Sequence, residues 1–401
     1  MRILVITPHF LPENFKCNDM AFELARRGHA VSVMTAIPDY PKGKFFEGYG
    51  VFHRRRETIN GVKIYRSLII PRGCGSPIRL ALNYISYTIG AIFMALWLGC
   101  NKKYDRVFVF QPSPVMVGIP AVIIKKIQKI PLYFWVQDLW PESLSAAGGI
   151  RNEFILKLFG RLTQWLYKNS DKILISSKGF KESICKKGNF QGKIIFYPNW
   201  IDNIDTSEEH VICPDLPNGF VVMVAGNMGD AQDLPAVMEA AFRLKEYSDI
   251  HFVFIGDGRK KEWVDSYIKE KELTETVHCL GRFPREAMPV FFNRATVLLL
   301  SLKDTEIFSL TVPSRLQAYM ATGKPIVAML NGEGAEVISE ADCGYCVPAG
   351  ESLALAELIV NLKNKESAEL SAKGMNGRVY SSRYYDFHKC LDTLEKIMSI
   401  S

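Results

Sequence analysis

Short apolar segments alternate with amphipathic stretches of helix length along the whole chain. The apolar segments are 2–7, 30–35, 62–66, 106–110, 132–136 and 172–176 in the first half, and 220–225, 251–255, 277–280, 296–300, 325–329 and 344–347 in the second. The stretch 18–27 has helical periodicity and ends before Gly28, a common stop for a helix. This alternation predicts two doubly wound parallel sheets of the α/β class.

The chain is predicted to form two similar domains, one of residues 1–200 and one of residues 219–380. Between them, residues 201–218 carry several acids and two prolines with little periodicity, as expected of a linker. Residues 381–401 are expected to form a C-terminal helix that packs back on the first domain. Ligands of such folds bind at the carboxyl ends of the strands, so we expect a cleft shared by the two sheets.

The composition excludes a disordered or collagen-like protein, because 48% of the 401 residues are hydrophobic and 23% are charged. The nine cysteines are scattered except for Cys343 and Cys346, so neither a disulfide framework nor a zinc site is predicted. A reducing cytoplasm is therefore the expected location. The first apolar run, at 2–6, is too short for a signal peptide.

Charge is divided unevenly between the halves. Residues 1–200 hold 29 Lys and Arg against 12 Asp and Glu, a net +17, whereas residues 201–401 hold 20 against 30, a net −10. Such asymmetry predicts that the first half meets a polyanion or an anionic membrane surface. The sequence has no zinc-finger or recognition-helix pattern and no basic stripe interleaved with aromatic residues, so nucleic acid is not the expected partner.

The segment 78–100 contains Arg79 as its only charged residue and is long enough to cross a bilayer. Its first half is only moderately apolar, with Asn83, Ser86 and Thr88, and a span here would separate the first sheet from its own strands. We therefore expect a helix that packs on the domain and offers an apolar edge to lipid. A wholly buried core helix is the alternative.

Glycine turns follow several strands of the second half. They are Gly226-Asn227-Met228-Gly229, Gly256-Asp257-Gly258, Gly281-Arg282 and Gly332-Glu333-Gly334. Glycine lets a backbone approach a ligand closely, and the free amides at a helix start attract phosphate. Single turns of this kind are common in α/β proteins, but their conjunction predicts a phosphate ligand. None has the spacing of dinucleotide-binding or P-loop motifs, which argues against dehydrogenases and P-loop kinases.

Five motifs along the chain resemble those of a known family. They are PDYPKG at 38–43, VQDLWPES at 136–143, VFIGDG at 253–258, LGRFP at 280–284 and VPSRLQAYMATGKP at 312–325. Their order and spacing are similar to those of family 4 retaining glycosyltransferases, and closest to the N-acetyl-L-fucosamine transferases of O-antigen and capsule synthesis. The resemblance implies the GT-B fold, in which two Rossmann-like domains face across a cleft, and metal-independent transfer with retention.

The chain departs from this family at its donor-binding signature. The Arg and Lys of the family's first glycine loop are here Asn227 and Gln232, and the family's two glutamates align near Leu310 and Ala318. We expect Arg315 to neutralise the donor diphosphate instead, because free amides at a helix start and a guanidinium can meet phosphate oxygens together. A solvated charge on the helix surface is the alternative.

Other donor contacts are expected from the same half. Arg282 and Lys303 are further candidates for the diphosphate, and Gln317 can hydrogen-bond the ribose hydroxyls, although a surface glutamine is the alternative. The remaining predicted donor-binding positions are Gly226, Asn227, Gly256, Asp257, Gly258 and Ser314.

Acidic residues after strands are the candidates for chemistry at the sugar. Asp138 can orient or deprotonate the acceptor hydroxyl or contact the donor sugar, and a capping role is the alternative. Asp304 and Glu306 can contact donor-sugar hydroxyls or be solvated. No D-x-D pair that would hold Mg²⁺ follows a strand, so neither a metal nor another cofactor is expected.

The loop after the first strand is expected to bind the acceptor or the donor. Glu13, Asn14 and Lys16 lie in this loop, and Tyr40 in the PDYPKG motif is a further acceptor candidate. His9 follows the strand directly and is expected to be a hydrogen-bonded structural residue.

Together these features predict a retaining glycosyltransferase, peripheral on the cytoplasmic face of the membrane. It is expected to move a sugar, N-acetyl-fucosamine or a related amino sugar, from a nucleotide diphosphate to a polyprenyl-diphosphate-linked saccharide, with UDP as the first choice. Two alternatives remain open. One is a nucleotide-sugar epimerase of the same fold, and the other is a catalytically silent sugar-nucleotide-binding protein, which the missing glutamates favour.

Overall fold

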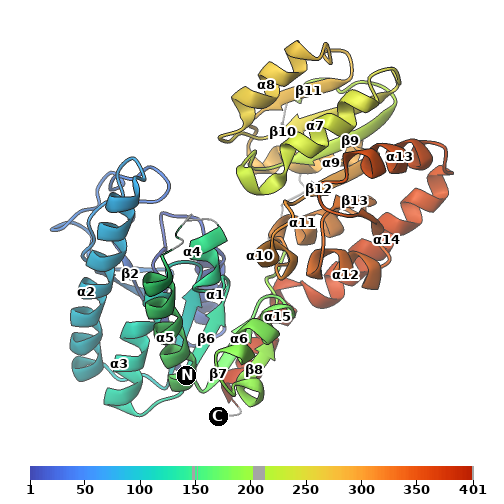
Figure 1. Ribbon diagram of the computed structural model, residues 1–401. Coiled ribbons are helices and arrows are strands. Elements are labelled where there is room, and N and C mark those ends of the chain that lie inside the picture. The colour runs from blue at the N-terminus through green and yellow to red at the C-terminus, as the bar shows by residue number, and fades with distance from the viewer. Residues whose placement is uncertain (147–149, 151, 202–212, 400–401) are drawn as a thin grey trace. The chain divides into compact units, whose positions relative to one another are not determined.

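The computed structural model describes residues 1–401 except 147–149, 151, 202–212 and 400–401. The chain divides into two compact units, which Figure 1 shows with their helices and strands. Unit 1 consists of Met1–Tyr197 and Leu391–Ser401, and unit 2 consists of Pro198–Cys390. Most of the predicted linker, residues 201–218, falls outside the described residues.

Unit 1 is built on an eight-stranded sheet of order β3-β4-β2-β1-β5-β6-β7-β8. Every neighbouring pair is parallel except β3 with β4. The strands are β1 (Arg2–Ile6), β2 (Ala30–Ala36), β3 (Arg56–Ile59), β4 (Val62–Ser67), β5 (Arg106–Gln111), β6 (Leu132–Val136), β7 (Lys172–Ile175) and β8 (Ile194–Phe196). All six predicted strands of this half are confirmed, and the two strands that were not predicted, β3 and β8, lie at the edges.

Helices connect these strands, as parallel pairing requires. They are α1 (Lys16–Arg26), α2 (Pro77–Asn101), α3 (Gly118–Gln128), α4 (Glu142–Ala146), α5 (Glu153–Asn169) and α6 (Phe180–Lys186). Local sequence explains the ends of two of them. The predicted helix 18–27 corresponds to α1, after which Gly28 has a φ of +89°. α2 begins with a proline, and the Ser76 side chain accepts a hydrogen bond from the amide of Arg79.

Unit 2 is built on a six-stranded parallel sheet of order β11-β10-β9-β12-β13-β14. The strands are β9 (Phe220–Ala225), β10 (Ile250–Ile255), β11 (Val277–Gly281), β12 (Val297–Ser301), β13 (Ile326–Met329) and β14 (Gly344–Val347). The helices are α7 (Leu234–Arg243), α8 (Lys261–Glu270), α9 (Met288–Arg294), α10 (Glu306–Ser309), α11 (Ser314–Thr322), α12 (Glu333–Glu340), α13 (Ser352–Lys363) and α14 (Ser367–Tyr384).

Two hydrophobic clusters bury the two faces of this second sheet. Along β9, Val222 and Val224 belong to one cluster, whereas Val221 and Met223 belong to the other. Side chains that alternate between faces and are buried on both sides explain why this strand reads as a continuous apolar run. The predicted fold class, two doubly wound α/β sheets, is confirmed.

The last helix, α15 (Phe387–Ser399), brings the end of the chain to unit 1. Glu395 lies 2.6 Å from Nε2 of His29 and accepts a hydrogen bond of 2.6 Å from Arg27. The guanidinium of Arg106 donates to the carbonyl of Met398 at 2.8 Å. The predicted start at residue 381 was wrong, because residues 381–384 continue α14.

A buried guanidinium ties together the edge of the first sheet. The Arg66 side chain has no solvent exposure and forms an ion pair of 2.5 Å with Glu57 of β3. It also donates to the carbonyl oxygens of Arg54 at 3.0 Å and Leu11 at 2.9 Å. One β4 side chain therefore joins an edge strand, the loop before it and the loop after β1.

Replacing Arg66 by Met is expected to lower the free energy of unfolding by about 3–5 kcal/mol, because it leaves a carboxylate and two carbonyl groups without their partner. Urea denaturation followed by tryptophan fluorescence measures this change. Lys63→Met, at an exposed position of the same strand, is the matched control and is expected to change stability by less than about 0.5 kcal/mol. Equal effects of the two substitutions would contradict the role given to Arg66.

Candidate active site

A cavity of about 340 Å³ lies at the carboxyl ends of β9, β10 and β11 in unit 2. This is the edge of a parallel sheet at which ligands bind in doubly wound folds. Both of the first two glycine turns contribute to the cavity. Its lining residues are Gly226, Asn227, Ile255, Gly256, Asp257, Arg282, Phe283 and Met288.

The two glycine turns pack against each other backbone to backbone. Gly256 has a φ of +145°, and a Cβ atom on it would lie 1.9 Å from the carbonyl oxygen of Gly226. A Cβ atom on Gly258 would lie 2.5 Å from the carbonyl oxygen of Met228. Hydrogen bonds of 2.8 Å from Gly226 N to Ile255 O and from Met228 N to Asp257 O join the turns. Glycine is thus required at Gly256 and Gly258, because a side chain at either position would collide with a backbone carbonyl oxygen of the first turn.

Arg315 extends from the first turn of α11 to this pair of loops. Its Nη2 donates a hydrogen bond of 3.1 Å to the carbonyl oxygen of Asn227, and a Cβ atom on Gly226 would lie 2.8 Å from the same nitrogen. The guanidinium therefore lies against the first glycine turn, and its role at a diphosphate stays a prediction. Its side chain remains partly exposed.

Several cations of this region have no carboxylate partner within the described part of the chain. They include Arg259 after the second glycine turn, Arg282 in the cavity lining, Lys303 after β12, and Arg315. Two lysines close in sequence to the second glycine turn are paired instead, Lys260 with Asp230 and Lys261 with Asp265. Unpaired positive charge beside glycine turns favours an anionic ligand.

The first glycine turn is closed by neutral side chains. The side-chain oxygen of Gln232 accepts a hydrogen bond of 2.9 Å from the amide of Gly229, and the backbone carbonyl of Gln232 accepts one of 2.5 Å from the hydroxyl of Ser301. The amide of Lys303 donates to Ala231 O at 2.9 Å. Gln232, where the resembled family has a cation, thus stabilises the loop itself.

The structure contradicts the predicted role of Gln317 at the ribose. This side chain is 2% exposed, and its Nε2 donates to the carbonyl of Asn199 at 3.0 Å. The alternative of a surface glutamine is also wrong. The amide of Gln317 instead satisfies a buried backbone carbonyl from the inner face of α11.

Asp304 and Glu306 lie after the carboxyl end of β12, and both are exposed. Asp304 accepts a hydrogen bond of 3.0 Å from Asn331, and Glu306 is the first residue of α10. Ser314, the first residue of α11, is also exposed. The structure thus brings these three residues to the same edge of the sheet as the glycine turns, and their roles at a ligand stay predictions.

Asp138 of unit 1 follows β6 and accepts a hydrogen bond from the hydroxyl of Ser143. Burial raises the pKa of its carboxyl to about 6, although the hydrogen bond from Ser143 opposes that change. A carboxyl group in this state is mostly ionised at pH 7 and can take up a proton close to that pH.

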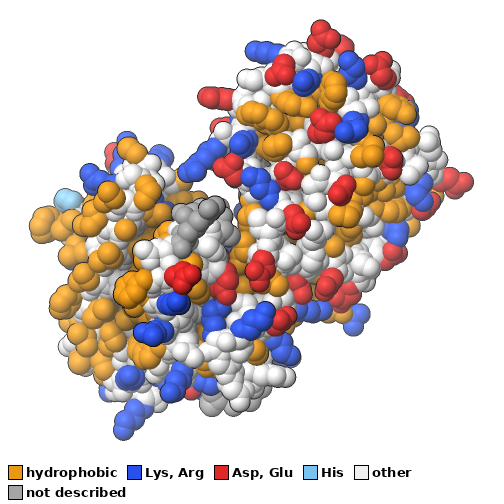
Figure 2. Space-filling model, in the orientation of Figure 1, with side chains coloured by type: hydrophobic (Ala, Val, Ile, Leu, Met, Phe, Trp, Pro, Cys, Tyr) orange, Lys and Arg blue, Asp and Glu red, His pale blue; other side chains and the backbone are white. Residues whose placement is uncertain are grey.

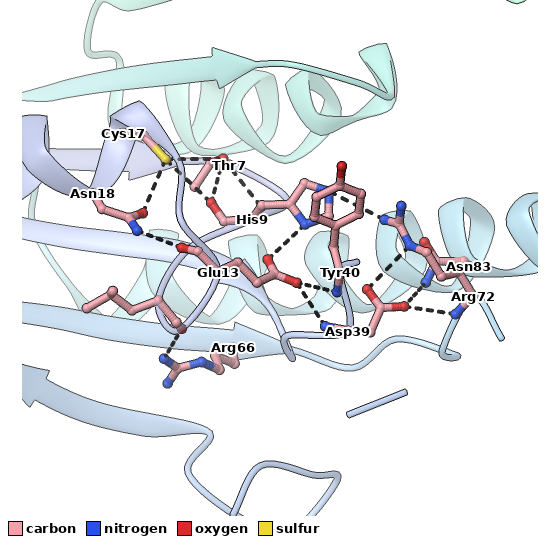
Figure 3. A network of polar contacts seen from close by, with 11 residues as sticks. Thr7, His9, Glu13, Cys17, Asn18, Asp39, Tyr40, Arg66, Arg72 and Asn83 are labelled. Atoms are coloured by element: carbon pink, nitrogen blue, oxygen red, sulfur yellow. Dashed lines mark hydrogen bonds and ion pairs between the residues drawn. The ribbon is translucent and has the colours of Figure 1, made fainter. Parts of the chain in front are cut away.

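Glu13 organises the loop after β1 and is not accessible to an acceptor (Figure 3). It is 3% exposed, and its Oε1 accepts hydrogen bonds from the amides of Asp39 at 2.9 Å and Tyr40 at 2.7 Å. Its Oε2 lies 2.8 Å from Nδ1 of His9. The prediction that Glu13 binds the acceptor was therefore wrong, and His9 has the structural hydrogen bond that was expected.

The same network contains residues that the sequence did not indicate (Figure 3). Asp39 is 1% exposed and accepts hydrogen bonds from the amide of Arg72 at 2.8 Å and from Asn83 of α2 at 2.9 Å. The Arg72 guanidinium lies over the ring of Tyr40 at 5.0 Å. The one available signal was the position of Asp39 within the PDYPKG motif.

Three of the predicted acceptor residues remain accessible or partly so. Tyr40 is 42% exposed, Asn14 is exposed, and Lys16 is the partly exposed first residue of α1. Acceptor binding by these side chains stays a prediction.

Comparisons with known proteins find similar sequences among glycosyltransferases. Residues 213–376 match the family model of the glycosyl transferases group 1. The chain is 27% identical to WbjE of Pseudomonas aeruginosa, named as a glycosyltransferase, over 75% of each chain. It is 25% identical to WcaI of Escherichia coli strain K12, named as a colanic acid biosynthesis glycosyl transferase, over 80% of this chain and 82% of the relative. The chain is a glycosyltransferase.

The fold of this glycosyltransferase is GT-B. The crystal structure of HepE from Anabaena in complex with UDP superposes with a TM-score of 0.72 at 14% identity, and the match covers 100% of both chains. The segment matched by the family model includes both glycine turns and Arg315. Within the described residues, no group of three or more His, Cys, Asp and Glu side chains is arranged to hold a metal ion.

The raised pKa of Asp138 predicts a pH-dependent stability. The folded glycosyltransferase holds the proton of the Asp138 carboxyl more tightly than the unfolded chain does. The stabilisation that this proton provides is therefore complete below about pH 4 and is lost as the pH rises through 6. The contribution of Asp138 to the free energy of unfolding is expected to fall by about 3 kcal/mol over this range, so the stability of the unmodified protein relative to Asp138→Asn is expected to fall by that amount. Urea titrations between pH 4 and pH 7 test it.

The matched control is Asp304→Asn, which removes an exposed carboxylate from unit 2. It is expected to leave the pH dependence as in the unmodified protein. A pH dependence that Asp138→Asn does not change would show that the Asp138 carboxyl is ionised as easily in the folded as in the unfolded chain.

Proposed function

We propose that this glycosyltransferase moves a sugar from UDP to a polyprenyl-diphosphate-linked saccharide, with retention, in the synthesis of a bacterial surface polysaccharide. Its relatives support the pathway class, because WcaI is named for colanic acid biosynthesis and AmsK of Erwinia amylovora for amylovoran biosynthesis. The UDP complex of HepE, which shares the fold, supports UDP as the first donor to test. The motif resemblance makes N-acetyl-L-fucosamine the first sugar to test.

The observation that carries the proposal is the position of the Arg315 guanidinium on the first glycine turn. A nucleotide diphosphate needs fixed positive charge and free amides, and the turn itself offers no cation. Arg315 lies against Gly226 from one side, while Arg282 lines the cavity. The two arginines thus take over the task that the resembled family gives to loop residues.

Sugar transfer develops charge in two places. The anomeric carbon becomes oxocarbenium-like, and negative charge gathers on the leaving diphosphate. Guanidinium groups fixed before the reaction stabilise that charge without reorganisation. We assign Asp304 and Glu306, which are exposed at the same sheet edge, to hydrogen bonds with hydroxyls of the donor sugar.

Asp138 is the candidate for the acceptor hydroxyl. Its carboxyl follows a central strand of unit 1, and its pKa of about 6 makes it an ionised hydrogen-bond acceptor at neutral pH. Orientation of the acceptor hydroxyl requires only this acceptor oxygen.

Arg315→Ala is expected to weaken UDP binding about ten- to hundredfold, because a charged hydrogen bond contributes about 1.5–3 kcal/mol. Turnover is expected to fall further, since charge on the leaving group grows in the transition state. Arg315→Lys recovers only part, because lysine lacks the planar fork that meets two phosphate oxygens. Calorimetric titration with UDP and a steady-state assay with membrane extract measure both effects.

Arg243→Ala is the matched control, because Arg243 is an exposed arginine of unit 2 that pairs with Glu239 on α7. It is expected to leave both quantities unchanged. Unchanged affinity and turnover in Arg315→Ala would move the diphosphate site to Arg282 or Lys303. Release of UDP without a sugar-lipid product would instead favour an epimerase-type reaction.

Activity is expected to survive EDTA, because the proposed neutralisation of the diphosphate uses arginine side chains and amides. The steady-state assay after dialysis against EDTA, compared with the same assay in the presence of Mg²⁺, tests this. Complete loss of turnover that Mg²⁺ restores would contradict a metal-independent transfer.

A further inference from the structure

One face of α2 is an exposed apolar stripe. Its six members are Ile78 at 75% exposure, Leu82 at 43%, Ile85 at 52%, Ile89 at 52%, Phe93 at 69% and Leu96 at 44%. At 3.6 residues per turn these side chains lie within an arc of about 80°, and the stripe is about 27 Å long. Figure 2 shows hydrophobic side chains along the left edge of the molecule, where Figure 1 places α2.

No polar side chain interrupts this stripe. Between Leu82 and Cys100, every exposed residue of α2 is apolar, and Arg79 is the only charged residue of the helix. Surface helices of soluble domains normally carry polar residues on their outer face. An outer face without them indicates that something other than water covers it.

The opposite face of α2 is fixed to unit 1. Tyr87, Ala91, Ala95 and Leu98 are buried there. The Asn83 amide donates to Asp39 at 2.9 Å and to the carbonyl of Ile70 at 2.7 Å. α2 is the one helix of the described residues with the length and hydropathy to cross a bilayer. These bonds to the core hold it against the sheet, so only its outer side is free to meet an apolar phase.

The charged residues near the stripe indicate what kind of surface covers it. Residues 58–104 contain six Lys and Arg and no Asp or Glu. Lys102 and Lys103 are exposed directly after the helix, and Arg79 is exposed in its first turn. Blue Lys and Arg side chains lie near both ends of the apolar strip in Figure 2.

We infer that the α2 stripe lies in the interface of an anionic lipid membrane, with the helix parallel to the surface and the basic side chains among the headgroups. An amphipathic helix with apolar residues on one side and cations at its ends binds such a surface through burial of its apolar side chains and through electrostatic attraction to anionic lipid. A second copy of this chain fits less well, because a two-fold contact would bring the same basic residues together. The inference rests on the proposed function only where it places the lipid-linked acceptor and the enzyme at the same membrane.

The first test is sedimentation with vesicles of phosphatidylcholine alone or with phosphatidylglycerol. The protein is expected to bind the anionic vesicles, and this binding is expected to weaken between 50 and 500 mM salt, in line with electrostatic attraction that salt screens. The triple variant Ile85→Ser, Ile89→Ser, Phe93→Ser is expected to bind at least about tenfold more weakly at every salt concentration. Lys102→Gln with Lys103→Gln is expected to weaken only the binding to anionic vesicles, by about fivefold per lysine.

The matched control is Leu353→Ser with Val379→Ser, which removes apolar side chains of 53% and 62% exposure from unit 2. It is expected to bind vesicles as the unmodified protein does. Urea denaturation of every variant shows whether the fold is intact, and UDP titration tests donor binding separately. Vesicle binding without UDP binding would contradict the proposed function and leave this inference standing.

Equal vesicle binding by the triple serine variant and the unmodified protein would overturn the inference. So would a failure of the unmodified protein to bind anionic vesicles at low salt. Analytical ultracentrifugation tests the alternative that a second copy of the chain covers the stripe. A dimer that the serine substitutions convert to monomers, without vesicle binding, would support this alternative and overturn the inference.

Discussion

The constraint on which this structure depends is the parallel pairing of its strands. Parallel neighbours require crossover connections, and those connections cover both faces of each sheet with helices. The strands are then buried on both sides and contain few residues that could do chemistry. Function is confined to the loops at the strand ends, where the glycine turns, Arg282, Asp138 and the loop after β1 are found. The close approach of Gly256 to Gly226 shows how tightly one of these edges is packed.

The sequence predicts the central strands well, because burial on both faces leaves a continuous apolar run. The edge strands β3 and β8 escape this pattern, since β3 reads Arg-Glu-Thr-Ile and has one face in water. Glu13 shows a second limit. Its partners are amides of residues 26 and 27 positions away, and a contact between two loops leaves no local signature. The position of Arg315 in a first helical turn was easier to predict, because Pro313 and Ser314 mark the start of α11 locally.

Hydropathy alone could not decide the position of α2. A buried core helix, a membrane span and an interfacial helix all contain long apolar segments, and they differ in what covers each face. The polar residues of this segment were the useful signal. The buried Asn83 side chain donates a hydrogen bond to Asp39, and this bond determines which side of α2 faces the domain.

The order of elements has a consequence for synthesis of the protein. Unit 2 is one continuous segment, Pro198–Cys390, whereas unit 1 needs the first 197 residues and the last helix. His29 marks where these parts meet, because one ring nitrogen lies 3.1 Å from the amino group of Met1 and the other 2.6 Å from Glu395. Domains generally fold as units, the N-terminal one first, as the chain leaves the ribosome. Here the first unit to begin is the last to be complete, because unit 1 lacks α15 until unit 2 has been synthesised.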